Sequence, residues 1–392
     1  MTHRLVIAIT GGGTLSIPKL FARPGASRLM LEAIVPYHAE ALRELVGGKV
    51  EQACSETTAR QMAVAAWQRA SRLLAGESQG TQAASVGNLA LGVGCTAALA
   101  TNRQRRGADR AFITVHGGAD TLAINMDLGV SRYQAGDNSI REQQELATAN
   151  LLIEALREYG LELGLPASTG EPDPLSQCQL ERQRANPDSR LVELVSGQTK
   201  LLVERDIKNS SQAAVSLEER GLIFSGSFNP LHEGHLEMAK AAEAIYAKPV
   251  LFELSVTNAD KPALDFLTIQ ERVNQLKGAG LNYALTRCSR FDQKAELFPG
   301  ATFIVGADTA LRIADPRFYA SGERGRDRAI EKIAALGCRF LVFGRRLQDT
   351  YLAANMLELP TSMRLICDPE MSYRNDISST ELRRRRAAKD GG

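Results

Sequence analysis

The sequence predicts an α/β protein of two domains, the C-terminal one a doubly wound, Rossmann-like parallel sheet. The chain has 392 residues, more than a single hydrophobic core usually organises. Its composition is 44% hydrophobic and 23% charged, which is typical of a globular protein. Its second half alternates short apolar runs with helical patterns, the order that builds a parallel sheet covered by helices.

A polar, proline-rich stretch separates the two predicted domains. Residues 166–174 contain three prolines and no bulky apolar side chain. This composition is typical of a linker or a long surface loop. We therefore expect an α/β domain over residues 1–165, a linker over residues 166–220 and a second domain over residues 221–392.

Two apolar runs lie inside the predicted linker, joined by Ser-Gly-Gln-Thr. They are Leu191–Val195 and Leu201–Val203. Two short apolar runs that flank a turn sequence are able to form a β-hairpin, and the structure of residues 191–220 is left open between a hairpin and a linker.

Strands and helices are expected throughout both domains. In the C-terminal domain the expected strands are Leu222–Phe224, Val250–Val256, Thr302–Val305, Arg339–Phe343 and Arg364–Ile366, and the expected helices are His235–Ala247, Leu267–Lys277 and Arg326–Leu336. In the N-terminal domain the expected strands are Arg4–Ile9, Leu89–Val93, Ala111–Val115 and Leu122–Met126, and the expected helices are Ser55–Leu74 and Ser139–Tyr159. In a doubly wound sheet, ligands bind at the carboxyl ends of the strands, near the point where the strand order reverses.

Charge and cysteine content exclude several classes of protein. Lys and Arg number 47 against 45 Asp and Glu, a formal net charge of +2, so no overall field attracts nucleic acid. No run approaches the roughly 18 apolar residues that a membrane helix needs. Six dispersed cysteines without a CxxC pair favour reduced thiols: Cys54, Cys95, Cys178, Cys288, Cys338 and Cys367. We expect a cytoplasmic protein whose partners are small molecules rather than nucleic acid or membrane, with a homo-oligomer left open.

A glycine turn and two histidines follow the first expected strand of the C-terminal domain. His232 and His235 are three residues apart and share one face of the helix that begins there. Gly226 and Gly234 allow a phosphate to approach the backbone closely. The free N–H groups of the helix N-terminus also attract anions. The segment is therefore interpreted as a phosphate-binding turn.

A histidine pair at this spacing has two alternative roles. Such pairs are common on protein surfaces, and a pair can form half of a metal site. The spacing differs from the zinc-protease HExxH, however, and no third ligand is evident nearby. We therefore expect no protein-bound metal, and the position after a buried strand and a glycine turn favours phosphate binding.

A second candidate anion site lies near the end of the chain. Ser378 and Glu381 fit a capping box, which places a helix N-terminus at Ser379 and Thr380. Arg383 is able to reach back as a bidentate phosphate clamp. The alternative is a capped surface helix followed by a solvated arginine run, Arg383–Arg386.

Together these segments resemble the nucleotidylyltransferase superfamily, in particular the nicotinamide/nicotinate-mononucleotide adenylyltransferases. The family pattern G-(S/T)-F-x-P-x-H-x-G-H is matched by Gly226-Ser227-Phe228-Asn229-Pro230-Leu231-His232-Glu233-Gly234-His235, and I-S-S-T-x-(I/L)-R is matched by Ile377-Ser378-Ser379-Thr380-Glu381-Leu382-Arg383. The strand ending in Gly306-Ala307-Asp308 is also similar. The resemblance implies attack of a mononucleotide phosphate on the α-phosphate of ATP, assisted by Mg²⁺, with release of pyrophosphate.

The resemblance also implies roles for individual residues. The catalytic residues would be His232, His235 and Arg383. Nucleotide would be bound by Gly226, Ser227, Phe228, Asn229, Gly234, Asp308, Ser379 and Thr380, with Asp308 on the ribose or the metal-linked network. Lys261 is a candidate for the acceptor phosphate, and a solvated loop lysine is the equal alternative.

The N-terminal domain contains a glycine turn, Gly11–Gly13, that is able to cradle a phosphate. Three further segments follow it: Pro24–Ser27, Tyr37–Ala41 and Ser55–Ala63. In this order they resemble the CinA C-terminal family of nicotinamide-mononucleotide amidohydrolases, over about residues 5–160. The family's serine nucleophile is not evident after Ala8, and its lysine is replaced by Leu42. Because a hydroxyl nucleophile needs an adjacent base, we expect a catalytically degenerate domain. Cys54 and Cys95 are weaker nucleophile candidates, since free cysteine is usually a small buried apolar residue.

Three functions remain open from sequence. The leading hypothesis is adenylyl transfer from ATP to nicotinamide or nicotinate mononucleotide. Adenylyl or cytidylyl transfer to another phosphate acceptor is the alternative within the same chemistry. A non-catalytic nucleotide-binding regulator is the alternative from another class.

Overall fold

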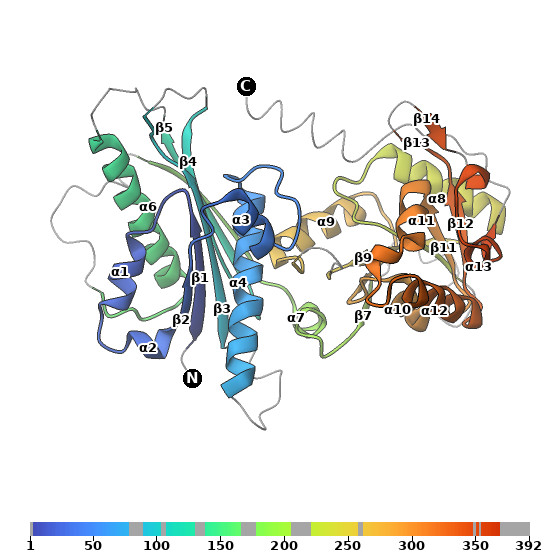
Figure 1. The fold of residues 1–392 in the computed structure, drawn as a ribbon, viewed down its shortest axis with the longest axis horizontal. Helices are drawn as coiled ribbons and strands as arrows, with labels where there is room; N and C mark the ends of the chain where they lie inside the picture. The colour runs from blue at the N-terminus through green and yellow to red at the C-terminus, as the bar shows by residue number, and fades with distance from the viewer. Residues whose placement is uncertain are drawn as a thin grey trace. The chain divides into compact units, whose positions relative to one another are not determined.

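The computed structural model describes residues 3–77, 89–102, 107–129, 138–165, 178–204, 221–257, 262–347, 350–352 and 354–368. The chain divides into two compact units (Figure 1). Unit 1 comprises Met1–Gln198 with Asp260–Gln270, and unit 2 comprises Thr199–Ala259 with Glu271–Gly392. In the described part of the chain, every helix is too short or too polar to cross a membrane.

Unit 1 is built on a six-stranded mixed sheet in the order β2-β1-β3-β4-β5-β6. Its strands are β1 (Arg4–Thr10), β2 (Met30–Ile34), β3 (Ala90–Ala98), β4 (Asp109–Gly117), β5 (Thr121–Gly129) and β6 (Gln179–Ala185). The first three strands pair in parallel and the remaining pairs are antiparallel. The expected α/β architecture is therefore confirmed for this part of the chain.

Helices cover both faces of the unit 1 sheet, with α4 on one face and α1 and α6 on the other (Figure 1). The helices are α1 (Ser16–Phe21), α2 (Ala26–Leu29), α3 (Ala39–Leu45), α4 (Glu56–Glu77), α6 (Ser139–Glu158) and α7 (Ser189–Ser196). Leu5, Ile7 and Ile9 alternate along β1 and pack in one core cluster with Leu151 and Leu152 of α6. This alternation is the period-two pattern of a strand.

Helix α4 lies directly against β3 because two glycines remove the side chains between them. A Cβ added at Gly92 would lie 2.0 Å from the Ala63 carbonyl oxygen, and one at Gly94 would lie 2.1 Å from that of Ala59. Both values are far below a normal contact, so the glycines set the distance between helix and sheet.

The two apolar runs in the predicted linker do not form a hairpin with each other. Leu191–Val195 lies within α7, where Asp188 caps the helix by accepting from the Leu191 N–H at 2.9 Å and Gly197 ends it with a left-handed φ of 86°. The other run, β7 (Leu201–Glu204), pairs with β10 of unit 2. The apolar residues of 191–195 thus follow helical rather than strand geometry. The predicted linker also contains β6, a mostly exposed edge strand.

Residues 262–270 extend unit 1 beyond its N-terminal sequence. Phe266 opens α9 (Phe266–Gly278), is 1% exposed, and donates its N–H to the Thr121 hydroxyl at 3.2 Å. Its ring centroid lies 5.6 Å from that of His116, which in turn contacts Trp67 edge-on at 5.2 Å. Burial lowers the pKa of His116 to about 4. The negative charges of Asp265 and Asp120 act in the opposite direction, but their effect on the pKa is smaller.

Unit 2 is built on a seven-stranded sheet in the order β15-β12-β11-β8-β9-β10-β7. Besides β7, its strands are β8 (Leu222–Ser225), β9 (Val250–Ser255), β10 (Tyr283–Thr286), β11 (Thr302–Gly306), β12 (Arg339–Phe343) and β15 (Cys367–Asp368). All pairs are parallel except β10 with β7. A two-stranded ribbon, β13 (Arg345–Leu347) with β14 (Thr350–Leu352), completes the unit.

Strand order reverses at β8 in unit 2. The chain proceeds from β8 to β9 and β10 on one side, and then returns to β11 and β12 on the other. The helices between the strands are α8 (Glu233–Tyr246), α9, α10 (Phe291–Leu297), α11 (Ala307–Ala314) and α12 (Gly322–Ala335), with α13 (Thr361–Arg364) before β15. The predicted doubly wound sheet is confirmed, and its reversal point lies between β8 and β11.

Several elements of unit 2 differ from expectation. Arg364–Ile366 was expected as a strand, but Arg364 is the last residue of α13 and the next two residues form a turn. The edge strand is Cys367–Asp368. Strand β10 and helices α10 and α11 were not predicted because they are only four to eight residues long. Periodicity over such short runs does not separate helix from strand.

Replacing Gly92 with Ala is expected to destabilise unit 1 by roughly 3 kcal/mol, because the new Cβ meets helix backbone that cannot move aside. Gly76→Ala on α4 is the matched control, since a Cβ there meets nothing within 4 Å and should stabilise the helix by up to about 1 kcal/mol. Denaturant unfolding followed by Trp67, the sole tryptophan, measures both. Equal stability of Gly92→Ala and wild type would contradict the expected packing.

The stability of unit 1 is expected to fall as pH drops from 6.5 towards 4. An unfolded histidine takes up a proton near pH 6.5, whereas folded His116 resists protonation until its lowered pKa of about 4 is reached. Protonation of His116 should therefore lower the free energy of unfolding by roughly 1.4 kcal/mol for each pH unit between pH 6.5 and pH 4. His116→Gln should flatten the dependence measured by Trp67 fluorescence, and an unchanged slope would refute the assignment.

Candidate functional site

The strand–turn–helix from β8 to α8 places both motif histidines at the start of a helix. Helix α8 begins at Glu233 with His232 as its N-cap and His235 in the first turn. Ser227 and Asn229 in the turn are exposed, whereas Phe228 and Gly234 are buried. The exposed groups therefore surround the N-terminal end of α8, where backbone N–H groups favour anions.

The two imidazole rings of this segment are stacked on each other. The ring centroids of His232 and His235 are 3.7 Å apart with an interplanar angle of 23°. His235 Nδ1 accepts the backbone N–H of His232 at 3.3 Å. When neutral, His235 therefore carries its proton on Nε2, which makes that nitrogen the donor of the ring.

An aromatic wall holds His235 in place. Its ring lies 5.2 Å from Phe228 and 5.9 Å from Phe224, and Phe228 also contacts Phe252 at 5.3 Å. Phe228 adopts a left-handed φ of 43°, a conformation that costs a bulky residue of order 1–3 kcal/mol. Burial of its ring offsets this cost, since Phe228 is 1% exposed.

Gly226 has a structural reason to lack a side chain. A Cβ at this position would lie 2.7 Å from the Phe228 ring. Its N–H donates to the Glu253 carbonyl at 3.0 Å and so continues the sheet. The glycine therefore makes room for Phe228, and its own N–H is already used within the protein.

Asp308 reaches the same edge of the sheet from the neighbouring strand. It lies in the first turn of α11, directly after β11, and β11 pairs in parallel with β8. Parallel strands end at a common edge, so the structure places Asp308 and the β8–α8 turn on the two sides of the reversal point.

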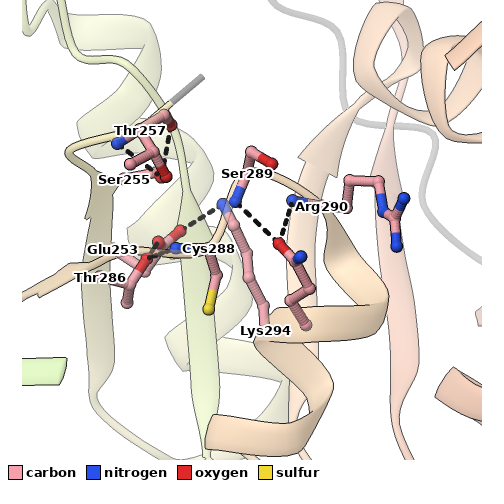
Figure 2. A network of polar contacts seen from close by, with 9 residues as sticks. Glu253, Ser255, Thr257, Thr286, Cys288, Ser289, Arg290 and Lys294 are labelled. Atoms are coloured by element: carbon pink, nitrogen blue, oxygen red, sulfur yellow. Dashed lines mark hydrogen bonds and ion pairs between the residues drawn. The ribbon is translucent and has the colours of Figure 1, made fainter. Parts of the chain in front are cut away.

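A buried ion pair next to this edge was not predicted from sequence (Figure 2). Glu253 on β9 is fully buried and accepts from Lys294 Nζ at 2.6 Å and from the Thr286 hydroxyl at 2.5 Å. Lys294, on α10, is 6% exposed. The sequence did carry a sign of this pair, because Glu253 interrupts the otherwise apolar run Val250–Leu254. Buried charges are tolerated only when paired in this way.

Gln275 was not predicted either. Its side-chain Oε1 accepts the Leu231 N–H at 2.8 Å, one residue before His232. Helix α9 thus holds the turn that carries the histidines. A polar residue on a helix gives no sequence signal of such a contact.

Four of the predicted site residues lie outside the described residues: Lys261, Ser379, Thr380 and Arg383. The other predicted site residues lie in segments that follow two paired parallel strands. Gly226, Ser227, Phe228, Asn229, His232, Gly234 and His235 follow β8, and Asp308 follows β11. Within the described part of the chain, no group of three or more His, Cys, Asp or Glu side chains is arranged to hold a metal ion.

The glycine turn of unit 1 is occupied by a carboxylate of the protein itself. Glu145 of α6 accepts from the Gly13 N–H at 2.8 Å, the Leu15 N–H at 3.1 Å and the Thr14 hydroxyl at 2.8 Å. The turn does bind an oxyanion group, as its composition suggested, but that group is a side chain from α6.

The cysteine and leucine of the unit 1 motifs are both buried. Cys95 is fully buried, which raises the pKa of its thiol and removes the thiolate that a nucleophile requires. Leu42 is 3% exposed and belongs to the packed interior.

Comparisons with known proteins found three similarities. A solved structure described as a competence or damage-inducible protein from Enterobacter asburiae is similar at 15% identity with a TM-score of 0.26, covering 39% of this chain and 87% of that chain. A probable nicotinate-nucleotide adenylyltransferase from Gloeobacter violaceus is 28% identical over 184 residues, 44% of this chain and 87% of that protein. The cytidylyltransferase-like family model matches residues 223–385. This match confirms the predicted resemblance of the C-terminal part of the chain to nucleotidylyltransferases.

Proposed function

We propose that this chain transfers an adenylyl group from ATP to the phosphate of nicotinate or nicotinamide mononucleotide and releases pyrophosphate. The observation that carries the proposal is the stacked His232–His235 pair at the N-terminus of α8, beside the reversal point of a doubly wound sheet. Anionic ligands of such sheets bind at this place.

In the proposed step, an oxygen of the acceptor phosphate attacks the α-phosphorus of ATP. The bond from the α-phosphorus to the bridging oxygen breaks, and pyrophosphate leaves with the electron pair. Reactions of this kind depend on positioning and charge stabilisation more than on a protein nucleophile. His235, donating from Nε2, and His232 beside it would stabilise the charge that develops on the phosphate oxygens.

The supporting shell keeps these donors in place. The rings of Phe224 and Phe228 pack against His235, and Phe252 packs against both of these rings. Gln275 holds the turn at Leu231. Groups that are fixed before substrate binds stabilise charge without reorganising during the reaction.

Mg²⁺ would enter with the triphosphate of ATP and neutralise part of its charge. The exposed turn and the Asp308 carboxylate suit an ion held mainly by substrate oxygens, because Mg²⁺ usually takes one or two protein carboxylates beside substrate phosphates. Outside the described residues, Ser379, Thr380 and Arg383 are proposed to bind the β- and γ-phosphates, and Lys261 the acceptor phosphate.

The choice of a pyridine mononucleotide rests on the similarity to a probable nicotinate-nucleotide adenylyltransferase. Transfer to another phosphate acceptor, or cytidylyl transfer, uses the same geometry and is the alternative. A nucleotide-binding regulator would bind ATP without turnover.

Unit 1 is proposed to be catalytically degenerate. Glu145 occupies its glycine turn, Leu42 is buried where a lysine base would stand, and the Cys95 thiol is buried. Unit 1 is then retained for ligand binding, oligomerisation or regulation.

The proposed activity is tested with the full chain, ATP, Mg²⁺ and a panel of phosphate acceptors: nicotinate mononucleotide, nicotinamide mononucleotide and phosphopantetheine. The same panel is repeated with CTP as the donor in place of ATP. Pyrophosphate release should be greatest with a pyridine mononucleotide, and His235→Ala should lower kcat by roughly 10²-fold or more. Lys240→Ala, an exposed change on the same helix, is the control. Absence of pyrophosphate with every acceptor would refute the enzyme, and an unchanged rate in His235→Ala would refute the role of that residue.

No ammonia release from nicotinamide mononucleotide is expected of unit 1, because the serine nucleophile of the resembled family is not evident and Leu42 replaces that family's lysine. A coupled ammonia assay on the full chain without ATP measures this. Release above the level of a heat-denatured sample would overturn the proposed degeneracy.

A further inference from the structure

A pocket of about 290 Å³ lies in unit 2 between the start of α10 and the start of α12. Its lining comprises Arg290, Asp292, Tyr319, Ala320, Ser321, Gly325, Arg328, Ala329 and Lys332. None of these residues belongs to the predicted nucleotide site. The volume is close to the lower limit of pockets that hold small molecules.

The rim of the pocket is basic. Three cationic side chains line it, Arg290, Arg328 and Lys332, against one carboxylate, Asp292. Arg328 and Lys332 are spaced four residues apart and share one face of α12. The N-terminus of α12 adds a partial positive charge at the same place.

The pairing of these cations leaves donors for a ligand. Arg290 binds Asp292 through Nε at 3.0 Å and Nη2 at 2.9 Å, so Asp292 is neutralised while Nη1 is not part of this pairing. Arg328 donates Nε to the Arg324 carbonyl at 3.1 Å and is exposed, so its two terminal nitrogens meet no carboxylate partner among the described residues. Lys332 pairs with Glu296, which lies outside the lining.

The floor of the pocket is apolar and aromatic. The Arg290 guanidinium lies 5.8 Å from the Tyr319 ring centroid, and Ala320 and Ala329 line the space beside it. Gly325 allows α12 to pack closely against Tyr319, because a Cβ there would lie 3.0 Å from Cβ of Tyr319. In Figure 2 the Arg290 side chain is directed away from the buried Glu253–Lys294 pair.

We propose that this pocket binds a phosphorylated small metabolite, with the phosphate on the Arg290–Arg328–Lys332 rim and the organic part over Tyr319 and the two alanines. Guanidinium forks match the oxygens of a phosphate in a bidentate geometry. The apolar floor contributes binding that a bare phosphate ion does not use. The site is separate from the proposed adenylyl transfer and does not depend on it.

Calorimetric titration of the full chain at physiological salt tests the site, with ribose 5-phosphate and inorganic phosphate as probes. Ribose 5-phosphate should bind more tightly than inorganic phosphate. Arg328→Gln should weaken its binding about tenfold or more, whereas Arg324→Gln, the same change one turn earlier and outside the lining, should alter it less than about twofold. Because Arg328 is exposed, its replacement leaves the fold intact.

His235→Ala separates this site from the proposed active site. Binding that survives His235→Ala and is lost in Arg328→Gln supports the proposal, whatever the outcome of the pyrophosphate assay. Binding lost in His235→Ala but retained in Arg328→Gln, or weakened equally by both arginine variants, would overturn it. Equal affinity for the two probes would overturn the assignment to a metabolite.

Discussion

The parallel pairing of β8 with both β9 and β11 is the constraint on which the rest of unit 2 depends. Because strand order reverses at β8, the segments that follow β8 and β11 leave the sheet in opposite directions. The edge between them is therefore left uncovered by crossover helices, and the β8–α8 turn occupies it. Phe228 and Gly226 then fit this turn to the sheet, and the histidines are positioned as a result.

The Glu253–Lys294 pair joins two further strands to this arrangement. Glu253 lies beside Ser225 in the β8–β9 register, and Thr286 ends β10. Removing water from two charges is costly, and the pair offsets this cost only when both partners hold their geometry. The ends of β9 and β10 and the start of α10 are consequently held together, next to the turn that carries the histidines.

Much of the fold was predictable from sequence because long, regular runs such as β1, β9 and α6 carry a clear periodicity. The histidine turn was predictable because its residues are contiguous. Glu253, Lys294 and Gln275 were not, since their contacts join residues 41 and 44 positions apart. The apolar run at residues 191–195 suits either a helix or a strand. It was misassigned because the capping hydrogen bond of Asp188, which favours the helix, was not recognised in the sequence.

The Glu145 carboxylate in the glycine turn of unit 1 means that the turn has a tethered competitor. A side chain fixed on α6 acts at a very high effective concentration, so a free anion has to displace it before contacting the Gly13 and Leu15 N–H groups. The turn is thus closed by competition rather than by the loss of its donors. A single change at residue 145 would return those donors to solvent, and with them the capacity of the turn to select an anion.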